Sequence, residues 1–261
     1  MKIKKVLKIN LFVFGFIILL QSCVSKKEIL YMQDIDAYNP MDISYSLNTL
    51  QVDDILNIHV GALIPEAAIP FNKNTNSLQQ NSNIDILKLE GYLVSKNKSI
   101  NFPVLGELSV AGKTIVDLEK DLKERLETGG YLIDPIVTVR LLNAKVTILG
   151  EVNNPGTYNF TENNMSFLQV LGLAGDLTIN GNREDVILIR NVDQIQTASH
   201  LNLTSADWLN GPFQNIKPND VIVVNPNGSK IKSSAFFGSA SSFVAIASLL
   251  ISTVVLINSF N

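Results

Sequence analysis

The chain has 261 residues, of which 46% are hydrophobic and 17% are charged, and its formal net charge is −3. No basic stretch is long enough to indicate binding of nucleic acid. Cys23 is the one cysteine, so a disulfide within the chain and a metal site of the CxxC type are excluded.

The first 22 residues have the pattern of a secretory signal peptide. A basic head, MKIKKVLK, precedes the apolar run INLFVFGFIILL. This run is shorter than the roughly 20 apolar residues that a membrane-spanning helix needs. The following Leu20-Gln-Ser-Cys23 resembles a bacterial lipoprotein signal, which is cut before the cysteine and acylated (palmitate) on it. We therefore predict removal of residues 1–22, lipidation of Cys23 and an N-terminal lipidated segment over residues 23–43. The alternative is an ordinary signal peptide, or an N-terminal anchor, with an incidental thiol.

The residues after Cys23 predict where the anchored chain resides. The next position is not aspartate, which would favour retention in the inner membrane, and no acidic run resembles a surface-export signal. We expect a protein that is lipid-anchored in the outer membrane and has its domains in the periplasm. The signal peptide carries four lysines, so its removal changes the formal net charge from −3 to −7, which is unremarkable for a periplasmic protein.

Residues 44–143 are predicted to form a first small α/β domain. Thr114 and Asp117 have the spacing of a capping box at the start of a helix, which Gly129 and Gly130 end. The polar segment 72–83 is predicted to be a loop. Alternating or apolar runs predict strands over residues 55–60, 91–94, 100–105 and 136–141.

Residues 144–227 are predicted to form a second domain with a β-grasp fold. Asn154-Pro155-Gly156 has proline and glycine where a tight turn needs a fixed and a positive φ. A short helix is expected from Met165 onward, and Gly175 can end it. Strands are predicted over residues 146–149, 185–190 and 220–225.

Residues 228–234 read as a polar linker, and residues 235–257 are predicted to form a transmembrane helix. This run would be about 34 Å long, against a hydrocarbon core of about 30 Å. Small and hydroxylated residues lie on one face of the helical wheel. That face indicates either close packing between helices or a surface that looks onto water inside a ring of copies, and the two interpretations are compatible. The pore-facing candidates are Ser241, Ser248, Ser252 and Ser259.

The predicted fold class is therefore α+β, with two small periplasmic α/β domains followed by one C-terminal transmembrane helix. The order of several motifs is similar to that of the outer-membrane polysaccharide export lipoproteins. Segments that resemble their poly-export domain are VDDILNIHV (52–60), FPVLGELSVAGKT (102–114) and YLIDPIVTV (131–139). Segments that resemble their soluble-ligand-binding β-grasp (SLBB) domain are VTILGEVNNPGTY (146–158), Ala174-Gly175 and VILIR (186–190).

The resemblance implies a homo-oligomeric ring, commonly of eight copies, around a large periplasmic cavity. It implies that the C-terminal helices form a porin-like barrel through the outer membrane, by which capsular or extracellular polysaccharide leaves the cell. It also implies an inner-membrane polysaccharide co-polymerase, often linked to a tyrosine kinase, as a partner.

Two positions depart from the family pattern. Asp53-Asp54 stands where the family usually has Gly-Asp, and Ala174-Gly175-Asp176 stands where it usually has Ala-Gly-Gly. Because glycine adopts positive φ more easily than aspartate, we expect the turn at Asp53 to differ. Only one clear β-grasp repeat fits between residues 145 and 225, which leaves the copy number open.

The sequence offers little that could catalyse a reaction, and we expect no enzyme activity, no cofactor and no metal. His59 and His200 are far apart, and motifs such as GxSxG and HExxH are absent. Neighbouring side chains on a strand point to opposite faces, so Asp53 and Asp54 are better suited to a turn than to a catalytic pair. Trp208 is expected to pack in the interior, although it could stack on a sugar.

A channel subunit is the function that these features favour, because one helix cannot enclose a passage and oligomers are then required. The first alternative is a periplasmic lipoprotein that binds sugar or a partner protein without forming a pore. A weaker alternative is an envelope hydrolase. Deletion of residues 235–261 distinguishes the first two, since a binding module would keep its function while the lipid remains.

Overall fold

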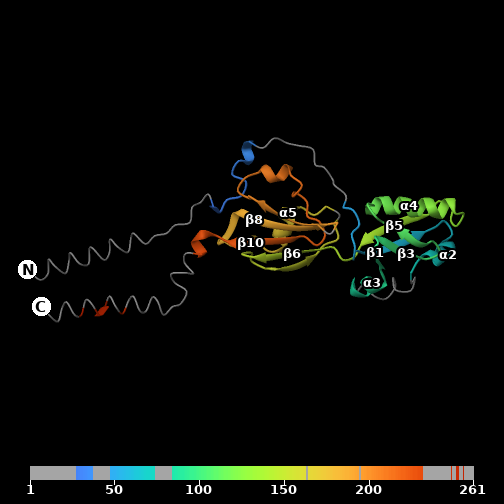
Figure 1. Ribbon diagram of the computed structural model, residues 1–261, viewed down its shortest axis with the longest axis horizontal. Coiled ribbons are helices and arrows are strands. Elements are labelled where there is room, and N and C mark those ends of the chain that lie inside the picture. Colours follow the sequence, from blue (N-terminus) through green and yellow to red (C-terminus); the bar gives the residue numbers. More distant parts are fainter. Residues whose placement is uncertain are drawn as a thin grey trace, which may run out of the picture.

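The computed structural model describes residues 28–37, 48–73, 84–162, 164–193, 195–231, 248, 251, 252 and 255. Within these residues the chain forms two domains that lie end to end (Figure 1), each built around its own hydrophobic core. The α+β part of the predicted fold class therefore agrees with the structure.

The first domain is built on the antiparallel sheet β2-β1-β5, in which the central strand β1 (Ile55–Gly61) pairs with β2 (Tyr92–Leu93) and β5 (Ile136–Leu141). Helix α4 (Ile115–Thr128) packs against this sheet through Leu118, Leu122 and Leu126, which are fully buried. Burial of large apolar side chains at this helical spacing is what holds the helix on the sheet. The remaining elements are α2 (Pro65–Ala68), η3 (Ile69–Phe71), α3 (Ile84–Glu90) and the hairpin β3 (Ser99–Phe102) and β4 (Gly106–Ser109).

Local signals in this domain act as predicted. Thr114 Oγ1 accepts a hydrogen bond from the amide of Asp117, whose carboxylate accepts one from the amide of Thr114, so both sides of the capping box are made. Helix α4 ends at Thr128, with Gly129 as its C-cap and Gly130 at φ 71°. Of the polar loop predicted over residues 72–83, the described part is Asn72 and Lys73.

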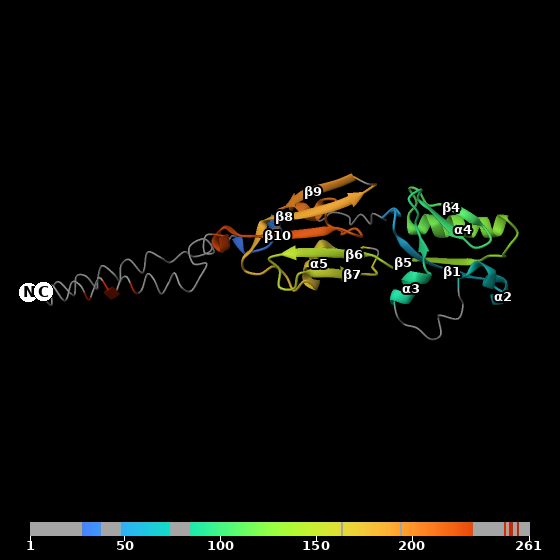
Figure 2. The same ribbon diagram turned by 60° about the horizontal axis from the view of Figure 1, so that its bottom comes forward.

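The second domain is a five-stranded sheet with the order β7-β6-β10-β8-β9 (Figure 2). The central strand β10 (Val221–Pro226) runs parallel to β6 (Lys145–Gly150) and antiparallel to β8 (Gly181–Val192). The edge strands are β7 (Gly156–Asn159) and β9 (Ile195–Leu201). This mixed sheet, with a helix between its first and second hairpins, is the predicted β-grasp arrangement.

Helix α5 (Phe167–Leu173) covers this sheet with the buried side chains Phe167, Val170 and Leu171. The short helix η5 (Asp207–Asn210) adds Trp208, which is 8% exposed and lies 5.7 Å from the Phe167 ring, centroid to centroid. The packing role predicted for Trp208 is therefore confirmed, and a sugar could not stack on its ring.

The segment 28–37, which includes η2 (Ile35–Ala37), lies on the second domain, although it precedes the first in the chain (Figure 1). The amides of Met32 and Gln33 donate to the carbonyls of Leu203 and Thr204, at 3.0 and 2.8 Å. We call residues 28–37 the N-terminal strap.

The predicted transmembrane helix over residues 235–257 is wrong for the described structure. None of the described helices is long and apolar enough to cross a membrane. The described residues of this range are Ser248, Ile251, Ser252 and Val255, and all four are helical.

The predictions for Cys23 and for the pore-facing serines concern residues that the structure describes only in part. Cys23 and two of the pore-facing candidates, Ser241 and Ser259, are outside. Ser248 and Ser252 are helical and exposed, one helical turn apart. Their exposure to a pore stays a prediction.

Candidate interdomain site

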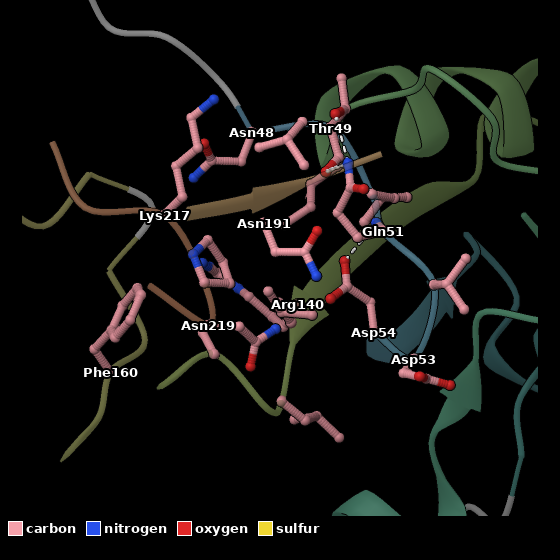
Figure 3. Close-up of a pocket in the computed structure, with 18 of the residues that line it drawn as sticks. Asn48, Thr49, Gln51, Asp53, Asp54, Arg140, Phe160, Asn191, Lys217 and Asn219 are labelled. Atoms are coloured by element: carbon pink, nitrogen blue, oxygen red, sulfur yellow. Dashed lines mark hydrogen bonds between the residues drawn. The ribbon is translucent and has the colours of Figure 1, made fainter. Parts of the chain in front are cut away.

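A cavity of about 1070 Å³ lies where the two domains meet, and residues of both domains line it (Figure 3). Its walls are the turn before β1 and the end of β5 in the first domain, and the end of β8 and the loop before β10 in the second. Small-molecule sites are usually concavities of about 300–1,000 Å³ at such domain boundaries. We call this cavity the interdomain cleft.

The first wall is a tight turn at residues 51–54. The amide of Gln51 donates to Asp54 Oδ2 at 2.8 Å, a contact drawn in Figure 3. Asp54 is 4% exposed, and this burial raises the pKa of its carboxyl to about 6, although the hydrogen bond from Gln51 acts in the opposite direction. The carboxylate therefore serves the turn, as predicted, and does not form a catalytic pair with Asp53.

Asp53 occupies the left-handed region at φ 68°, the conformation that glycine would adopt most easily. Aspartate thus takes the positive φ itself, and a difference between this turn and that of the family stays a prediction. Asp176 does the same at φ 71°, directly after Gly175 at φ 72°. Both departures from the family pattern thus keep a backbone that glycine could also adopt.

The opposite wall is the loop before β10, which carries Lys217 and Asn219. A buried ion pair holds this loop: Asp220 accepts from Arg190 Nε at 3.0 Å and from Arg190 Nη2 at 2.7 Å. Asp220 Oδ2 also accepts from the amide of Lys217 at 2.8 Å. A charged pair with this many hydrogen bonds fixes geometry well, so the backbone that presents Lys217 to the cleft is held in place.

Side chains tie the two walls together. Within the first wall, Asn143 at the end of the first domain accepts from the amide of Ile55 at 2.9 Å and donates to the carbonyl of Asp53 at 2.9 Å. Asp193 of the second domain forms an ion pair with Lys98 of the first, and its amide donates to Gln51 Oε1 at 3.2 Å. The contacts of Asp193 therefore join the two domains across the cleft.

Polar side chains converge in the middle of the cleft. Figure 3 shows Arg140, Asn191 and Asn219 directed toward the same space, from β5, β8 and the loop before β10. Asn57 is the cross-strand partner of Arg140 in the β1–β5 pair, so both side chains leave the same face of the sheet. The one aromatic residue of the described lining is Phe160, which is 7% exposed.

The histidines considered in the sequence do not meet. His59 is an exposed residue of β1, and His200 lies on β9 with its Nδ1 2.5 Å from Asp185 Oδ1. In the described part of the chain, no group of His, Cys, Asp and Glu could hold a metal ion. Sequence reasoning missed Arg140, Asn191 and Lys217, because no motif joins them and only the packing of the domains brings them together.

Two family models match the chain. The model described as polysaccharide biosynthesis/export protein matches residues 45–142, and the SLBB domain model matches residues 145–197. Together these matches cover more than half of the chain, and they meet at the interdomain cleft.

The chain is also similar to two curated relatives. It is 32% identical over 112 residues to the EPS I polysaccharide export outer membrane protein EpsA of Ralstonia nicotianae, which covers 41% of this chain and 28% of that protein. It is 30% identical over 92 residues to the EpsA protein of Ralstonia solanacearum, covering 34% of this chain and 24% of that protein. The chain thus matches about a quarter of the length of these relatives.

Proposed function

The chain belongs to the polysaccharide biosynthesis/export protein family, and from this premise we propose that it exports polysaccharide at the outer membrane. The observation that carries the proposal is the order of a poly-export domain and an SLBB domain in one chain. The outer membrane named for both relatives agrees with the location expected from the sequence. The family is one of export proteins, which agrees with the expectation that the chain is not an enzyme.

We propose that several copies form a ring and that the polysaccharide passes through the middle of the ring in the periplasm. Each described domain is filled by its own hydrophobic core, so a polymer has no path through a single domain. A passage must then be enclosed by neighbouring copies, and a closed ring with heterologous contacts is the arrangement that achieves this. An inner-membrane co-polymerase, often linked to a tyrosine kinase, is the partner we propose on the periplasmic side.

The N-terminal strap supports a defined orientation of the subunit. Residues 24–27 separate the proposed lipid anchor at Cys23 from Glu28, the first described residue, a reach of at most about 17 Å when extended. Since the strap is bonded to Leu203 and Thr204, a lipid on Cys23 would hold the SLBB domain close to the membrane. The poly-export domain would then lie farther into the periplasm.

The experiment that tests this function deletes the gene and measures surface polysaccharide, with the full-length gene and a Cys23→Ala variant supplied in trans. We expect loss of surface polysaccharide on deletion, recovery with the full-length gene and poor recovery with the variant. Native mass spectrometry of the detergent-extracted protein should show a closed oligomer. Normal surface polysaccharide in the deletion strain would refute the export function.

A binding module is the second candidate, because the interdomain cleft has the size and polar lining of a ligand site. The two functions differ in assembly: a binding module would be extracted as a monomer, and its loss would leave polysaccharide on the surface. An extracted monomer together with a normal surface coat would favour this second function.

A further inference from the structure

The interdomain cleft presents three cations that are not held in ion pairs, and of these Lys217 is the one that acts electrostatically on nearby carboxylates, those of Asp193 and Asp220. Lys96, Arg140 and Lys217 line it, and none forms an ion pair with a described carboxylate. We propose that the cleft binds a carboxylated saccharide, such as a segment of uronic acid residues in the exported polysaccharide. This inference rests on the proposed function and adds the chemical class of the polysaccharide.

Most of the acidic side chains of the cleft are engaged by other groups and are not available to Arg140. Asp193 is already paired with Lys98, and Asp54 is buried in its own turn. Figure 3 shows the carboxylate of Asp53 directed away from Arg140. Among the described acidic residues of the lining, this leaves Glu162, an exposed side chain that accepts from the amide of Thr161 at 3.0 Å. Arg140 therefore faces the cleft with its guanidinium available for a bidentate contact with a ligand carboxylate.

Amide side chains surround this guanidinium. Asn57, Asn191 and Asn219 line the cleft, and their side chains make no hydrogen bond to any residue that the structure describes. An amide both donates and accepts, which suits the hydroxyl and ring oxygens of a sugar. A uronic acid carries both a carboxylate and hydroxyl groups. The cations of the cleft could bind the carboxylate, and the amides could bind the hydroxyls.

The lack of an exposed aromatic platform favours a charged sugar over a neutral one. Phe160, the aromatic residue of the described lining, is 7% exposed and cannot offer a ring face. A neutral saccharide would therefore be held by amides that also bond well to water, and such hydrogen bonds give little net affinity. Hydrogen bonds to charged groups are the stronger contribution available in this cleft.

The test is calorimetric titration of the full-length, detergent-extracted protein with tetragalacturonate as the carboxylated probe. Maltotetraose is the neutral probe of equal length, and sodium sulfate is the simple anion. We expect tetragalacturonate to bind at least about tenfold more tightly than maltotetraose. R140A and K217A should each weaken tetragalacturonate binding by roughly tenfold or more, and R140K should weaken it by less than R140A does.

K120A is the matched control, because Lys120 is an exposed lysine of α4 outside the cleft and its removal should leave binding unchanged. Thermal unfolding of each variant shows whether it is folded, and R140K keeps the test valid if R140A is not. Equal binding of the two tetrasaccharides, unchanged binding in R140A and K217A, or displacement by equimolar sulfate would each overturn the inference. If export requires the protein but tetragalacturonate does not bind, this inference fails and the proposed function stands.

Discussion

Arg190 and Asp220 form an ion pair in the interior of the SLBB domain, with Nη2 2.7 Å from Oδ2 and exposures of 7% and 1%. Arg190 also donates to the carbonyls of Pro212 and Asn215, at 3.1 and 2.9 Å. One guanidinium therefore connects β8 to both ends of the loop that leads into β10. This loop forms a wall of the interdomain cleft, so the stability of the domain and the shape of the cleft depend on the same pair.

Replacement of Arg190 by methionine should destabilise the protein strongly. R190M leaves the carboxylate of Asp220 buried without its partner, and such a change costs about 3–5 kcal/mol. The free energy of unfolding, measured by urea titration, checks this. R125M is the control, because Arg125 forms an exposed i,i+4 pair with Asp121 that is worth less than about 1 kcal/mol. Equal losses in the two variants would contradict a special role for the buried pair.

The left-handed conformation of Asp53 predicts different effects for two small substitutions. Residue 53 has φ 68°, which glycine adopts without strain, so D53G should fit the turn. Alanine has a Cβ that makes this φ unfavourable, so D53A should strain the turn. We expect D53G to be more stable than D53A by about 1 kcal/mol. The comparison is direct because Asn143 bonds to the backbone carbonyl of residue 53, a contact that both variants keep. Equal melting temperatures of the two variants would refute the strain argument.

Sequence signals predicted those parts of the fold that depend on neighbours in the chain. The capping box of Thr114 and Asp117 involves residues three apart, and the glycines after α4 act on the helix they follow. Strand β9 was missed, because its residues 195–200 are mostly exposed and mostly polar and give no apolar alternation. An edge strand of this kind is specified by its pairing with β8, which a local pattern does not contain.

The interdomain cleft was also missed because it depends on contacts between residues that are far apart in the sequence. Arg140 is an exposed arginine on a strand, and Lys217 is a lysine in a loop, which are ordinary surface positions when each is considered alone. Their common setting depends on the contacts of Asp193 with Lys98 and Gln51, which join residues 95 and 142 positions apart. No periodicity or spacing in the sequence encodes such a contact.

Asp54 should make folding stability depend on pH between about 4 and 6. Its carboxyl has a raised pKa of about 6 in the folded protein against 3.8 as the ordinary value, so the folded state binds the proton more tightly. This contribution to stability is full below pH 3.8 and is lost as the pH rises through about 6. The total change is on the order of 2–3 kcal/mol.

The measurement for Asp54 is urea unfolding of the wild type and of D54N from pH 4 to pH 7. The asparagine does not titrate, and its Oδ1 can still accept from the amide of Gln51. Other groups titrate in both proteins, so the difference between the two curves reports on residue 54. If the difference stays constant across this range, the raised pKa is wrong.

Two glycines of the SLBB domain should respond in opposite ways to alanine. A Cβ on Gly150 would lie 2.0 Å from the carbonyl oxygen of Val224, and φ there is 91°. Since the obstacle is backbone of β10, G150A should cost several kcal/mol, on the order of 3 or more. Gly172, inside α5, has no atom outside its own helix backbone and chain neighbours within 4 Å of an added Cβ, so G172A should stabilise the protein by about 0.5–1 kcal/mol. Thermal unfolding of both variants tests the pair, and destabilisation by G172A would contradict the helix argument.

The N-terminal strap should loosen when one hydroxyl is removed. Tyr31 donates to Asp176 Oδ1 at 2.5 Å, and the guanidinium of Arg183 lies 5.0 Å from the centre of its ring. Y31F keeps the ring on Arg183 but removes the hydrogen bond, a loss of about 1 kcal/mol, and strap opening should become about fivefold more frequent. Hydrogen exchange of the Met32 and Gln33 amides measures that opening, because both are bonded to the SLBB domain.

The control for the strap is Y131F, since Tyr131 belongs to the poly-export domain and packs on Phe71, 5.8 Å between centroids. This variant should leave exchange of the strap amides unchanged. Asp176 still accepts from the amide of Leu177 in Y31F, so the turn after α5 should persist and the faster exchange should be confined to the strap. Faster exchange throughout the SLBB domain would instead indicate that Tyr31 belongs to the folding core, and unchanged exchange at Met32 would show that the hydroxyl does not hold the strap.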